Sequence, residues 1–363
     1  MGDSCRLGSF EKIAVFRALM LGDLLCVVPA LRALRGAYPN AEITLIGLPW
    51  AKSFVGRFSN YLDDFIEFPG FPGFPEIEPK IDEWPGFLSR VQERNFDLAI
   101  QLQGSGNLAN SITALFGARR TAGFFTREFW CPDPETFAEF PENETEIGRF
   151  LRLMEFLGIP LRGDHLEFPI TEDDEQEFGE LDAANALISS DYVCLHPGAR
   201  FISRRWDPQK FADVADALAA EGLHVVLTGT AAERDLTSAV GRAMTAPFLD
   251  LAGQTTLGAL GVLLKRSRLL ISNDTGVSHI AAALRTPSVV VVLGSDSKRW
   301  QMYDPTQHRV VRAEDINCRP CEFVECPIGH LCSVGVRTEH VVMEAMSLLR
   351  SSRPLQTHQA HTL

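Results

Sequence analysis

The stretch SNDTGVSHIAAAL, residues 272–284, joins a short apolar run to an alanine-rich segment. The run before it, residues 269–271, predicts a buried strand, and the segment after Gly276 predicts a helix. Asp-Thr-Gly is also the signature of aspartic proteases, but that class requires a β-rich fold and two copies of the motif or a dimer of short chains. This chain has one copy, placed between a strand and a helix. The stretch therefore predicts a strand-to-helix turn in an α/β fold.

The same alternation of short apolar runs and helical spacing extends along the chain in both directions. Strands are predicted at residues 12–16, 42–47, 96–104, 192–196, 224–229, 269–272 and 288–293. Helices are predicted at residues 24–39, 208–222 and 257–265. Strands that alternate with helices predict parallel sheets covered by helices, and such sheets bind ligands beyond the carboxyl ends of their strands.

An acidic segment, TEDDEQEFGELD at residues 171–182, separates the two halves of this pattern. It is poor in large aliphatic side chains, which indicates a solvated helix or linker. We therefore predict a first doubly wound domain at residues 1–178 and a second at residues 179–350. Residues 351–363 are expected to form a flexible tail.

Composition limits the classes of partner. The formal net charge of −13 argues against duplex nucleic acid, because neutralising phosphates requires an excess of Lys and Arg. No apolar run approaches the roughly 18 residues of a membrane-spanning helix. The N-terminus lacks the basic and apolar layout of a secretory signal, so we expect a cytoplasmic protein.

The turn after the strand at residues 269–272 has the features of an anion site. Asp274 or Thr275 can cap the helix, and Gly276 lets a ligand approach the backbone. The helix N-terminus then favours a phosphate, which His279 could reach from one turn further on. Alternatively, Asp274 is only a cap and His279 is only a packed helix residue.

Two other predicted strand ends carry polar residues. Arg204 and Arg205 follow the strand at residues 192–196, and their forked donors suit diphosphate oxygens, although a surface basic pair is the simpler interpretation. Gly229 ends the strand at residues 224–229. Glu233 could bind a ribose hydroxyl or stabilise the first turn of its helix.

In the first half, Gly22 and Asp23 lie where the first strand meets its helix, and Gln103 and Gly104 end another strand. A carboxylate at position 23 could accept the proton of an attacking sugar hydroxyl. It could also serve only the helix N-terminus, which would favour its ionised form at neutral pH.

Two further segments have open interpretations. Cys318, Cys321, Cys326 and Cys332 could hold a structural metal or remain a cluster of reduced or redox-labile thiols. The repeat FPGFPGFP, residues 68–75, predicts a loop. Its phenylalanines could contact a lipid or an acceptor, or pack on the N-terminal domain.

Four segments together resemble glycosyltransferase family 9, whose best-known members are the ADP-heptose:lipopolysaccharide heptosyltransferases. They are LGDLLCVVPALRAL, HPGARFISRRWDPQKFADV, LAGQTTLGALGVLLKRSRLLISNDTGVSHIAAAL and CRPCEFVECPIGHLC. The resemblance runs from about residue 12 to residue 346, with the motifs in the expected order. Two positions on the acceptor side depart from the family pattern, at residues 18–20 and 101–104.

The resemblance implies a GT-B fold, in which two Rossmann-like domains face each other across the active site. It implies inverting, metal-independent transfer of a sugar, expected to be heptose from ADP-heptose, with no other cofactor. The acceptor would be a lipopolysaccharide core or another cell-surface glycan, bound by the N-terminal domain in peripheral contact with the inner membrane. The C-terminal domain would take the donor.

Individual residues match the family's motifs. Asp23 falls at the position of the general base, and Arg204 falls where members place a basic residue near the donor phosphates. Asp274, Thr275, Gly276 and His279 match the donor motif. Two alternatives from other classes stay open: an enzyme resembling sugar-nucleotide epimerases, and a non-catalytic protein that binds nucleotide-sugar. A dehydrogenase is disfavoured because no G-x-G-x-x-G follows the first strand.

Overall fold

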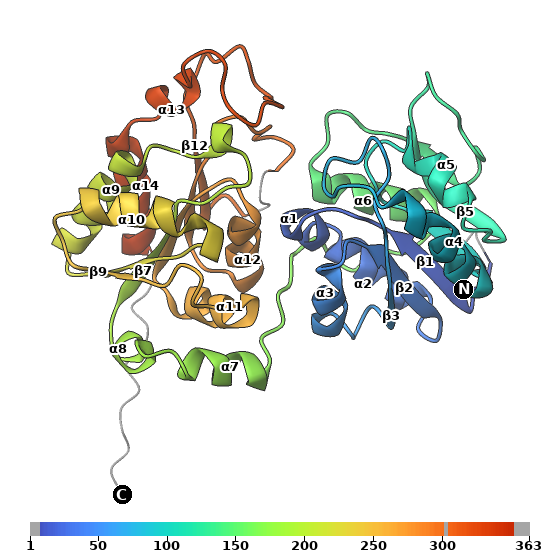
Figure 1. Cartoon of the computed structure of the whole chain (residues 1–363), viewed down its shortest axis with the longest axis horizontal. Coiled ribbons are helices and arrows are strands. Elements are labelled where there is room, and N and C mark those ends of the chain that lie inside the picture. The colour runs from blue at the N-terminus through green and yellow to red at the C-terminus, as the bar shows by residue number, and fades with distance from the viewer. Residues whose placement is uncertain (1–7, 301–303, 352–363) are drawn as a thin grey trace, which may run out of the picture. The chain divides into compact units, whose positions relative to one another are not determined.

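The computed structural model describes residues 8–300 and 304–351 of the 363-residue chain. The chain divides into two compact units (Figure 1). The N-terminal unit extends to Pro169 and also includes the segment Lys298–Gln301, whereas the C-terminal unit begins at Ile170. The domain boundary predicted after residue 178 lies within helix α7 (Glu172–Gly179). The predicted tail lies almost entirely outside the described residues.

A parallel six-stranded sheet forms the centre of the N-terminal unit. Its strands are β1 (Lys12–Phe16), β2 (Glu42–Gly47), β3 (Asp64–Glu67), β4 (Leu98–Gln101), β5 (Arg120–Phe125) and β6 (Phe137–Glu139). They lie in the order β3-β2-β1-β4-β5-β6. This is the doubly wound Rossmann order, in which successive strands are added on one side of β1 and then, from β4 onward, on its other side, while all strands stay parallel. The carboxyl ends of β1 and β4 are therefore where a ligand site is expected.

Helices cover both faces of this sheet (Figure 1). They are α1 (Leu21–Leu25), α2 (Val28–Ala37), α3 (Ala51–Arg57), α4 (Trp84–Glu93), α5 (Ala109–Ala114) and α6 (Glu146–Phe156), with a 3₁₀ turn η1 at Ile81–Glu83. The predicted helix at residues 24–39 is thus two helices. The break falls before Pro29, which suits the first turn of α2, where its missing N–H has no partner to lose.

The C-terminal unit repeats the same architecture. Its strands are β7 (Tyr192–His196), β8 (His224–Leu227), β9 (Phe248–Asp250), β10 (Leu269–Asn273), β11 (Ser288–Val291) and β12 (His308–Val311). They lie in the order β12-β11-β10-β7-β8-β9, all parallel. Here the strand order reverses between β7 and β10, where His196 and Ser272 lie side by side in the parallel register.

The helices of the C-terminal unit form two layers. They are α7 (Glu172–Gly179), α8 (Ala184–Ile188), α9 (Pro208–Ala220), α10 (Arg234–Ala243), α11 (Leu257–Arg266), α12 (Gly276–Leu284), α13 (Leu331–Gly335) and α14 (Thr338–Ser351), with 3₁₀ turns η2 (Ile202–Arg204) and η3 (Ala231–Glu233). Helices α9, α10 and α14 pack together on one face of the sheet, and α11 and α12 on the other (Figure 1). The predicted α/β class and Rossmann-like organisation are confirmed.

Local sequence explains particular elements. The acidic segment forms α7, whose N-terminus is closed by a capping box between Thr171 and Asp174. The loop at residues 68–75 packs on the N-terminal core rather than projecting from it. Phe68 is fully buried, with its ring centroid 5.0 Å from that of Phe16, and Phe71 packs against Trp84 at 4.9 Å. The packing interpretation of this loop is therefore confirmed.

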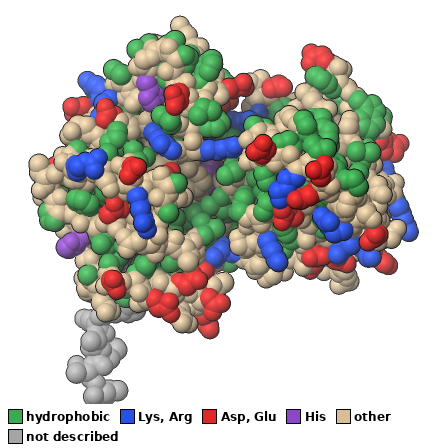
Figure 2. Space-filling model, viewed as in Figure 1, with side chains coloured by type: hydrophobic (Ala, Val, Ile, Leu, Met, Phe, Trp, Pro, Cys, Tyr) green, Lys and Arg blue, Asp and Glu red, His purple; other side chains and the backbone are tan. Residues whose placement is uncertain are grey.

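Charged side chains of both signs lie on the face of the molecule shown in Figure 2. On the face shown in Figure 2, basic and acidic side chains are interspersed and form no extended basic surface. Across residues 8–300 and 304–351, no helix is both long enough and apolar enough to cross a bilayer.

Candidate functional site

Asp23 lies in α1, immediately beyond the carboxyl end of β1, and its side chain is 21% exposed. Its neighbour is Arg17, the fully buried residue that follows β1. The Arg17 Nε donates to the Asp23 carbonyl oxygen over 2.9 Å, and Arg17 Nη2 lies 3.7 Å from Asp23 Oδ1. The same guanidinium donates to the Leu102 carbonyl oxygen beyond β4. Arg17 thus joins the carboxyl ends of β1 and β4, at the position where the strand order reverses.

Glu146, the first residue of α6, completes this cluster and was not predicted from the sequence. Its side chain is 3% exposed and accepts hydrogen bonds from Arg17 over 3.1 Å, Arg149 over 2.9 Å and Arg299 over 2.8 Å. Burial would raise the pKa of Glu146, but the three arginines outweigh burial and lower it to about 2. Glu146 is therefore a fixed negative charge beside Asp23.

The pKa of Asp23 moves in the opposite direction. Burial, the largest effect, raises the pKa of Asp23, and the charge of Glu146 raises it further. Arg17, Arg299 and a hydrogen bond from the Met20 backbone lower the pKa, but the net change is a rise. Burial therefore outweighs the backbone hydrogen bond in its effect on the pKa of Asp23, and an ionised Asp23 at neutral pH stays a prediction. A carboxylate with a raised pKa is a stronger base, which suits proton abstraction near neutral pH.

The other residues predicted on the acceptor side support this strand end. Gln103 is buried, and its Oε1 accepts a hydrogen bond from the Ala18 N–H over 2.8 Å. Gly104 has a φ of +63°, a left-handed conformation that favours glycine. Gly22 is buried within α1. Gln103 thus fixes the backbone that leads from β1 to Asp23.

In the C-terminal unit, Asn273 joins the carboxyl ends of β10 and β7. Its Nδ2 donates to the Pro197 carbonyl oxygen over 2.7 Å, and its Oδ1 accepts from the Trp206 N–H over 3.0 Å. Asn273 was not among the predicted site residues, although it lies within residues 272–284. A buried amide beside Asp-Thr-Gly was the available signal.

Helix α12 begins at Gly276, three residues after this asparagine. Thr275 is the N-cap residue, and its side chain makes no capping hydrogen bond. The Thr275 carbonyl oxygen accepts from the N–H and the hydroxyl of Ser278, over 3.0 and 2.7 Å. Gly276 opens the helix, and His279 is 3% exposed within its first turn. Since the Thr275 hydroxyl does not occupy the first-turn N–H groups, the end of α12 suits an anion.

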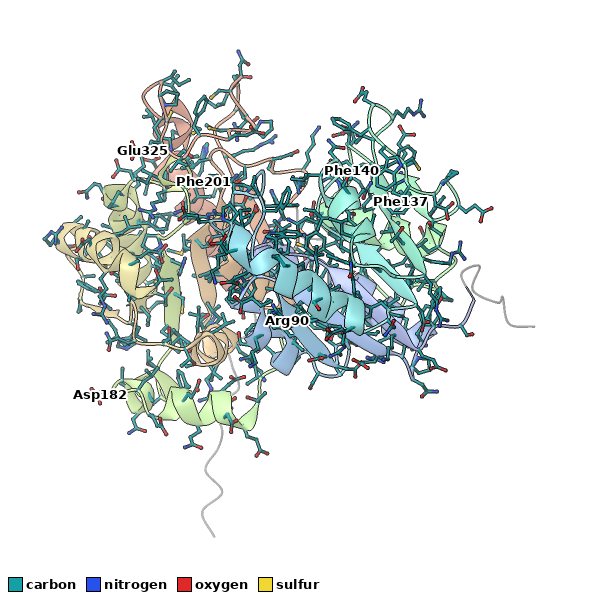
Figure 3. All side chains as sticks on the ribbon, turned by 45° about the vertical axis from the view of Figure 1, so that its right-hand side comes forward. Arg90, Phe137, Phe140, Asp182, Phe201 and Glu325 are labelled. Atoms are coloured by element: carbon teal, nitrogen blue, oxygen red, sulfur yellow. The ribbon has the colours of Figure 1, made fainter. Side chains whose placement is uncertain are left out.

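Arg204 ends the 3₁₀ turn η2. Its guanidinium stacks over the ring of Phe201, 5.0 Å from the centroid (Phe201 is labelled in Figure 3). Its Nε is buried and has no hydrogen-bond partner among the described residues. Arg205 differs, because its Nε donates to the Ala199 carbonyl oxygen over 2.8 Å and so serves the loop itself. Arg204 is the better candidate for binding an anionic ligand.

Glu233 closes a capping box at η3, where its Oε2 accepts from the Thr230 N–H over 2.8 Å. The other carboxylate oxygen lies against Gly198, where an added Cβ would come within 2.2 Å of it. Gly229 lies beyond β8, and an added Cβ there would meet the Glu233 Cβ at 3.3 Å. Both glycines therefore make room for Glu233. The alternative role in helix stabilisation is observed, and a ribose contact stays a prediction.

Gly198→Ala is therefore expected to displace Glu233 and weaken the capping box. We expect a loss of about 1 kcal/mol of stability, within the range of lost N-cap interactions. The melting temperature measures this directly. Gly56→Ala is the matched control, because a Cβ at that helical glycine meets nothing within 4 Å. In a Glu233→Ala background, Gly198→Ala should cost nothing more, and an equal loss in both backgrounds would contradict the explanation.

His196 is the last residue of β7 and directly precedes the loop that contains Gly198 and Arg204. Its Nδ1 is 3.0 Å from Thr228 Oγ1. Burial lowers the pKa of His196, and the nearby Glu233 raises it in part. A neutral imidazole at this position adds no positive charge to the site, so the positive charges near the end of β7 come from arginines such as Arg204.

The cysteine-containing segment packs against the loop that carries Arg204. The Ser203 N–H donates to the Val324 carbonyl oxygen over 2.9 Å, and the His330 Nε2 donates to the Ser203 carbonyl oxygen over 2.8 Å. The His330 N–H is 3.2 Å from Cys326 Sγ. This segment therefore holds the backbone of η2 in place.

The four cysteines themselves are free thiols. Burial raises the pKa of Cys332, and the nearby Cys318 and Cys326 raise it further. Among the described residues, which include all four cysteines, no three His, Cys, Asp or Glu side chains are placed to hold a metal ion. Both interpretations, a structural metal and a thiol cluster, stay predictions.

Comparison with known proteins identifies the family. The model of glycosyltransferase family 9 (heptosyltransferase) matches residues 86–332. The chain is 38% identical over 294 residues to a lipopolysaccharide heptosyltransferase 3 of Escherichia coli, an alignment that covers 77% of this chain and 83% of that protein.

Solved structures share the fold. The family 9 glycosyl transferase of Veillonella parvula DSM 2008 superposes with a TM-score of 0.76 at 21% identity, over 96% of this chain and 100% of that one. ADP-heptose lps heptosyltransferase II of E. coli superposes with a TM-score of 0.72 at 19% identity, over 93% and 98%. The fold is the two-domain, Rossmann-like GT-B fold. Because the family model spans more than half of the sequence, the chain belongs to glycosyltransferase family 9 and is a glycosyltransferase.

Proposed function

We propose that this glycosyltransferase moves a heptose from ADP-heptose to a lipopolysaccharide core by an inverting single displacement. The names of its relatives support the donor and the acceptor class: one is a lipopolysaccharide heptosyltransferase 3 and another an ADP-heptose lps heptosyltransferase II. The observation that carries the mechanism is Asp23, a partly exposed carboxylate with a raised pKa at the carboxyl end of β1.

In this reaction the acceptor hydroxyl attacks the anomeric carbon of the heptose. A new carbon–oxygen bond forms while the bond to the diphosphate oxygen breaks, and ADP leaves. Asp23 takes the proton of the acceptor hydroxyl as the attack proceeds. One displacement at the anomeric carbon inverts its configuration.

The C-terminal unit would bind the donor and stabilise the leaving group. ADP gains negative charge as the bond breaks, and the candidate groups to meet that charge are Arg204 and the backbone amides at Thr275 and Gly276. Protein donors directed at the diphosphate supply the stabilisation that a metal ion supplies in other enzymes, so we propose that transfer needs no added metal. His279 and Asp274 would complete the donor contacts.

A panel assay tests this function. The purified protein is incubated with ADP-, UDP- and GDP-linked sugars, each with and without lipopolysaccharide core acceptors, and nucleotide release is measured. ADP release from ADP-heptose that depends on the acceptor supports the proposal. Release without acceptor would indicate an epimerase-like or hydrolytic reaction, and no release with any acceptor would reject the proposed donor.

Because a core acceptor is attached to lipid, vesicles carrying it should bind the protein.

A further inference from the structure

The segment Lys298–Gln301 belongs to the N-terminal unit, although the chain on either side of it belongs to the C-terminal unit. Arg299 in this segment contacts the first residue of α6 at two points. The Glu146 N–H donates to the Arg299 carbonyl oxygen over 2.8 Å, and the Arg299 Nε donates to Glu146 Oε2 over 2.8 Å. The Arg299 guanidinium also stacks over the Trp300 ring at 4.7 Å. Backbone and side chain together fix Arg299 against Glu146.

The two oxygens of Glu146 have different partners. Oε2 accepts from Arg299 and from Arg149 Nη1, over 2.8 and 2.9 Å. Oε1 accepts from Arg17 Nη2 over 3.1 Å, and that same nitrogen lies 3.7 Å from Asp23 Oδ1. Because two arginines hold Oε2, Oε1 stays directed at Arg17, and Arg17 stays beside Asp23.

Other contacts hold the rest of this cluster. Arg149 also donates to the Pro141 carbonyl oxygen over 3.0 Å and stacks over the ring of Phe140, which is labelled in Figure 3. Arg17 stacks over Phe150 at 4.5 Å. Arg149 and Arg17 are therefore fixed by their own surroundings, whereas Arg299 approaches from a distant part of the sequence and is 34% exposed. Arg299 is the member that can be changed with the least damage to the core.

We propose that Arg299 is a positioning residue for Asp23, acting through Glu146. The inference rests on the proposed role of Asp23 as the base. In this role Arg299 does not contact the substrate. It keeps Glu146 aligned with Arg17 and adds a positive charge near Asp23. The charged groups around Asp23 are Arg17, Glu146 and Arg299, of which the two arginines lower its pKa and Glu146 raises it.

The sign of the expected effect follows from these charges. The base must be ionised to act, so the acid limb of the profile of kcat/KM against pH reports its pKa. Arg299→Met removes a positive charge and should move the acid limb to higher pH. We expect a shift of about 0.5–1 unit, modest because the guanidinium is partly exposed. Arg299→Lys keeps the charge and should restore most of the wild-type position.

Two further variants sharpen the test. Glu146→Gln removes the negative charge and should move the acid limb to lower pH, opposite to Arg299→Met. Arg152→Gln is the matched control. Arg152 lies on α6, the helix that begins with Glu146, but its side chain is 62% exposed and pairs with Glu144 rather than with Glu146. It should leave the limb in place. A loss of active protein that is the same at every pH lowers the whole profile and leaves the limb in place, and melting temperatures measured across the limb show whether unfolding varies with pH.

For a variant that has no activity, NMR can follow the titration of the Asp23 carboxyl carbon directly. The signal of this carbon is assigned by its loss in Asp23→Asn. An unmoved limb and an unmoved carboxyl titration in Arg299→Met would overturn the inference, as would shifts of the same sign in Arg299→Met and Glu146→Gln. These outcomes are distinct from failure of the proposed function. Full activity of Asp23→Asn would remove the base itself, whatever Arg299 does.

Discussion

Asp23→Asn is expected to reduce acceptor-dependent release of ADP by about 10²–10⁴-fold, the range that a positioned general base contributes. The amide keeps the shape of the side chain but cannot accept the hydroxyl proton. Donor affinity should stay near normal, because the candidate donor contacts belong to the C-terminal unit. Turnover and the Kd for ADP, measured on the same preparation, separate these two effects.

Loss of stability does not account for such a result. Because folding raises the pKa of Asp23, the folded protein binds its proton more tightly than the unfolded chain does. This carboxyl therefore costs stability as the pH rises above its unfolded pKa, and Asp23→Asn should melt no lower than wild type at neutral pH. Asp213→Asn, an exposed carboxyl on α9, is the control and should retain activity. Wild-type turnover by Asp23→Asn would remove Asp23 from the mechanism.

Arg204→Ala is expected to weaken binding of ADP or of the nucleotide-sugar by about 10- to 100-fold. A hydrogen bond to a charged group contributes roughly 1.5–3 kcal/mol, and each 1.4 kcal/mol is about a factor of ten in affinity. The buried Nε of Arg204 has no hydrogen-bond partner among the described residues, so removing this nitrogen breaks no hydrogen bond within that part of the chain. Calorimetric titration with ADP measures the effect.

Arg205→Ala provides the comparison for Arg204→Ala. Arg205 donates to the Ala199 carbonyl oxygen, so its loss should lower the melting temperature more than Arg204→Ala does. Arg204→Lys keeps the charge without the forked donors and should bind ADP with intermediate affinity. An unchanged affinity in Arg204→Ala would assign the phosphate contact to another residue.

The fold could be predicted because its signals are local. Short apolar runs alternate with helical spacing, and this alternation alone predicts both sheets and their carboxyl edges. Boundaries were less accurate: the strand expected at residues 96–104 is β4, Leu98–Gln101, because the polar residues after it leave the sheet to form the site. The helix expected at residues 24–39 is divided before Pro29, a signal that was present in the sequence but not used.

The surroundings of Asp23 could not be predicted in the same way. Arg17 and Glu146 are 129 residues apart, and Glu146 and Arg299 are 153 apart. No spacing rule connects residues at such separations, because their meeting depends on how the whole unit packs. The raised pKa of Asp23 depends on that packing too: the sequence showed a helix N-terminus, but not the burial that outweighs it.

The anomeric configuration of the transferred heptose distinguishes a single displacement from a double one. The claim is that one displacement, with Asp23 as the base, joins donor and acceptor. NMR of the product formed from ADP-heptose and a lipopolysaccharide core acceptor gives the configuration at the new glycosidic carbon. We expect a configuration opposite to that of the donor. A product with the donor's configuration would contradict it.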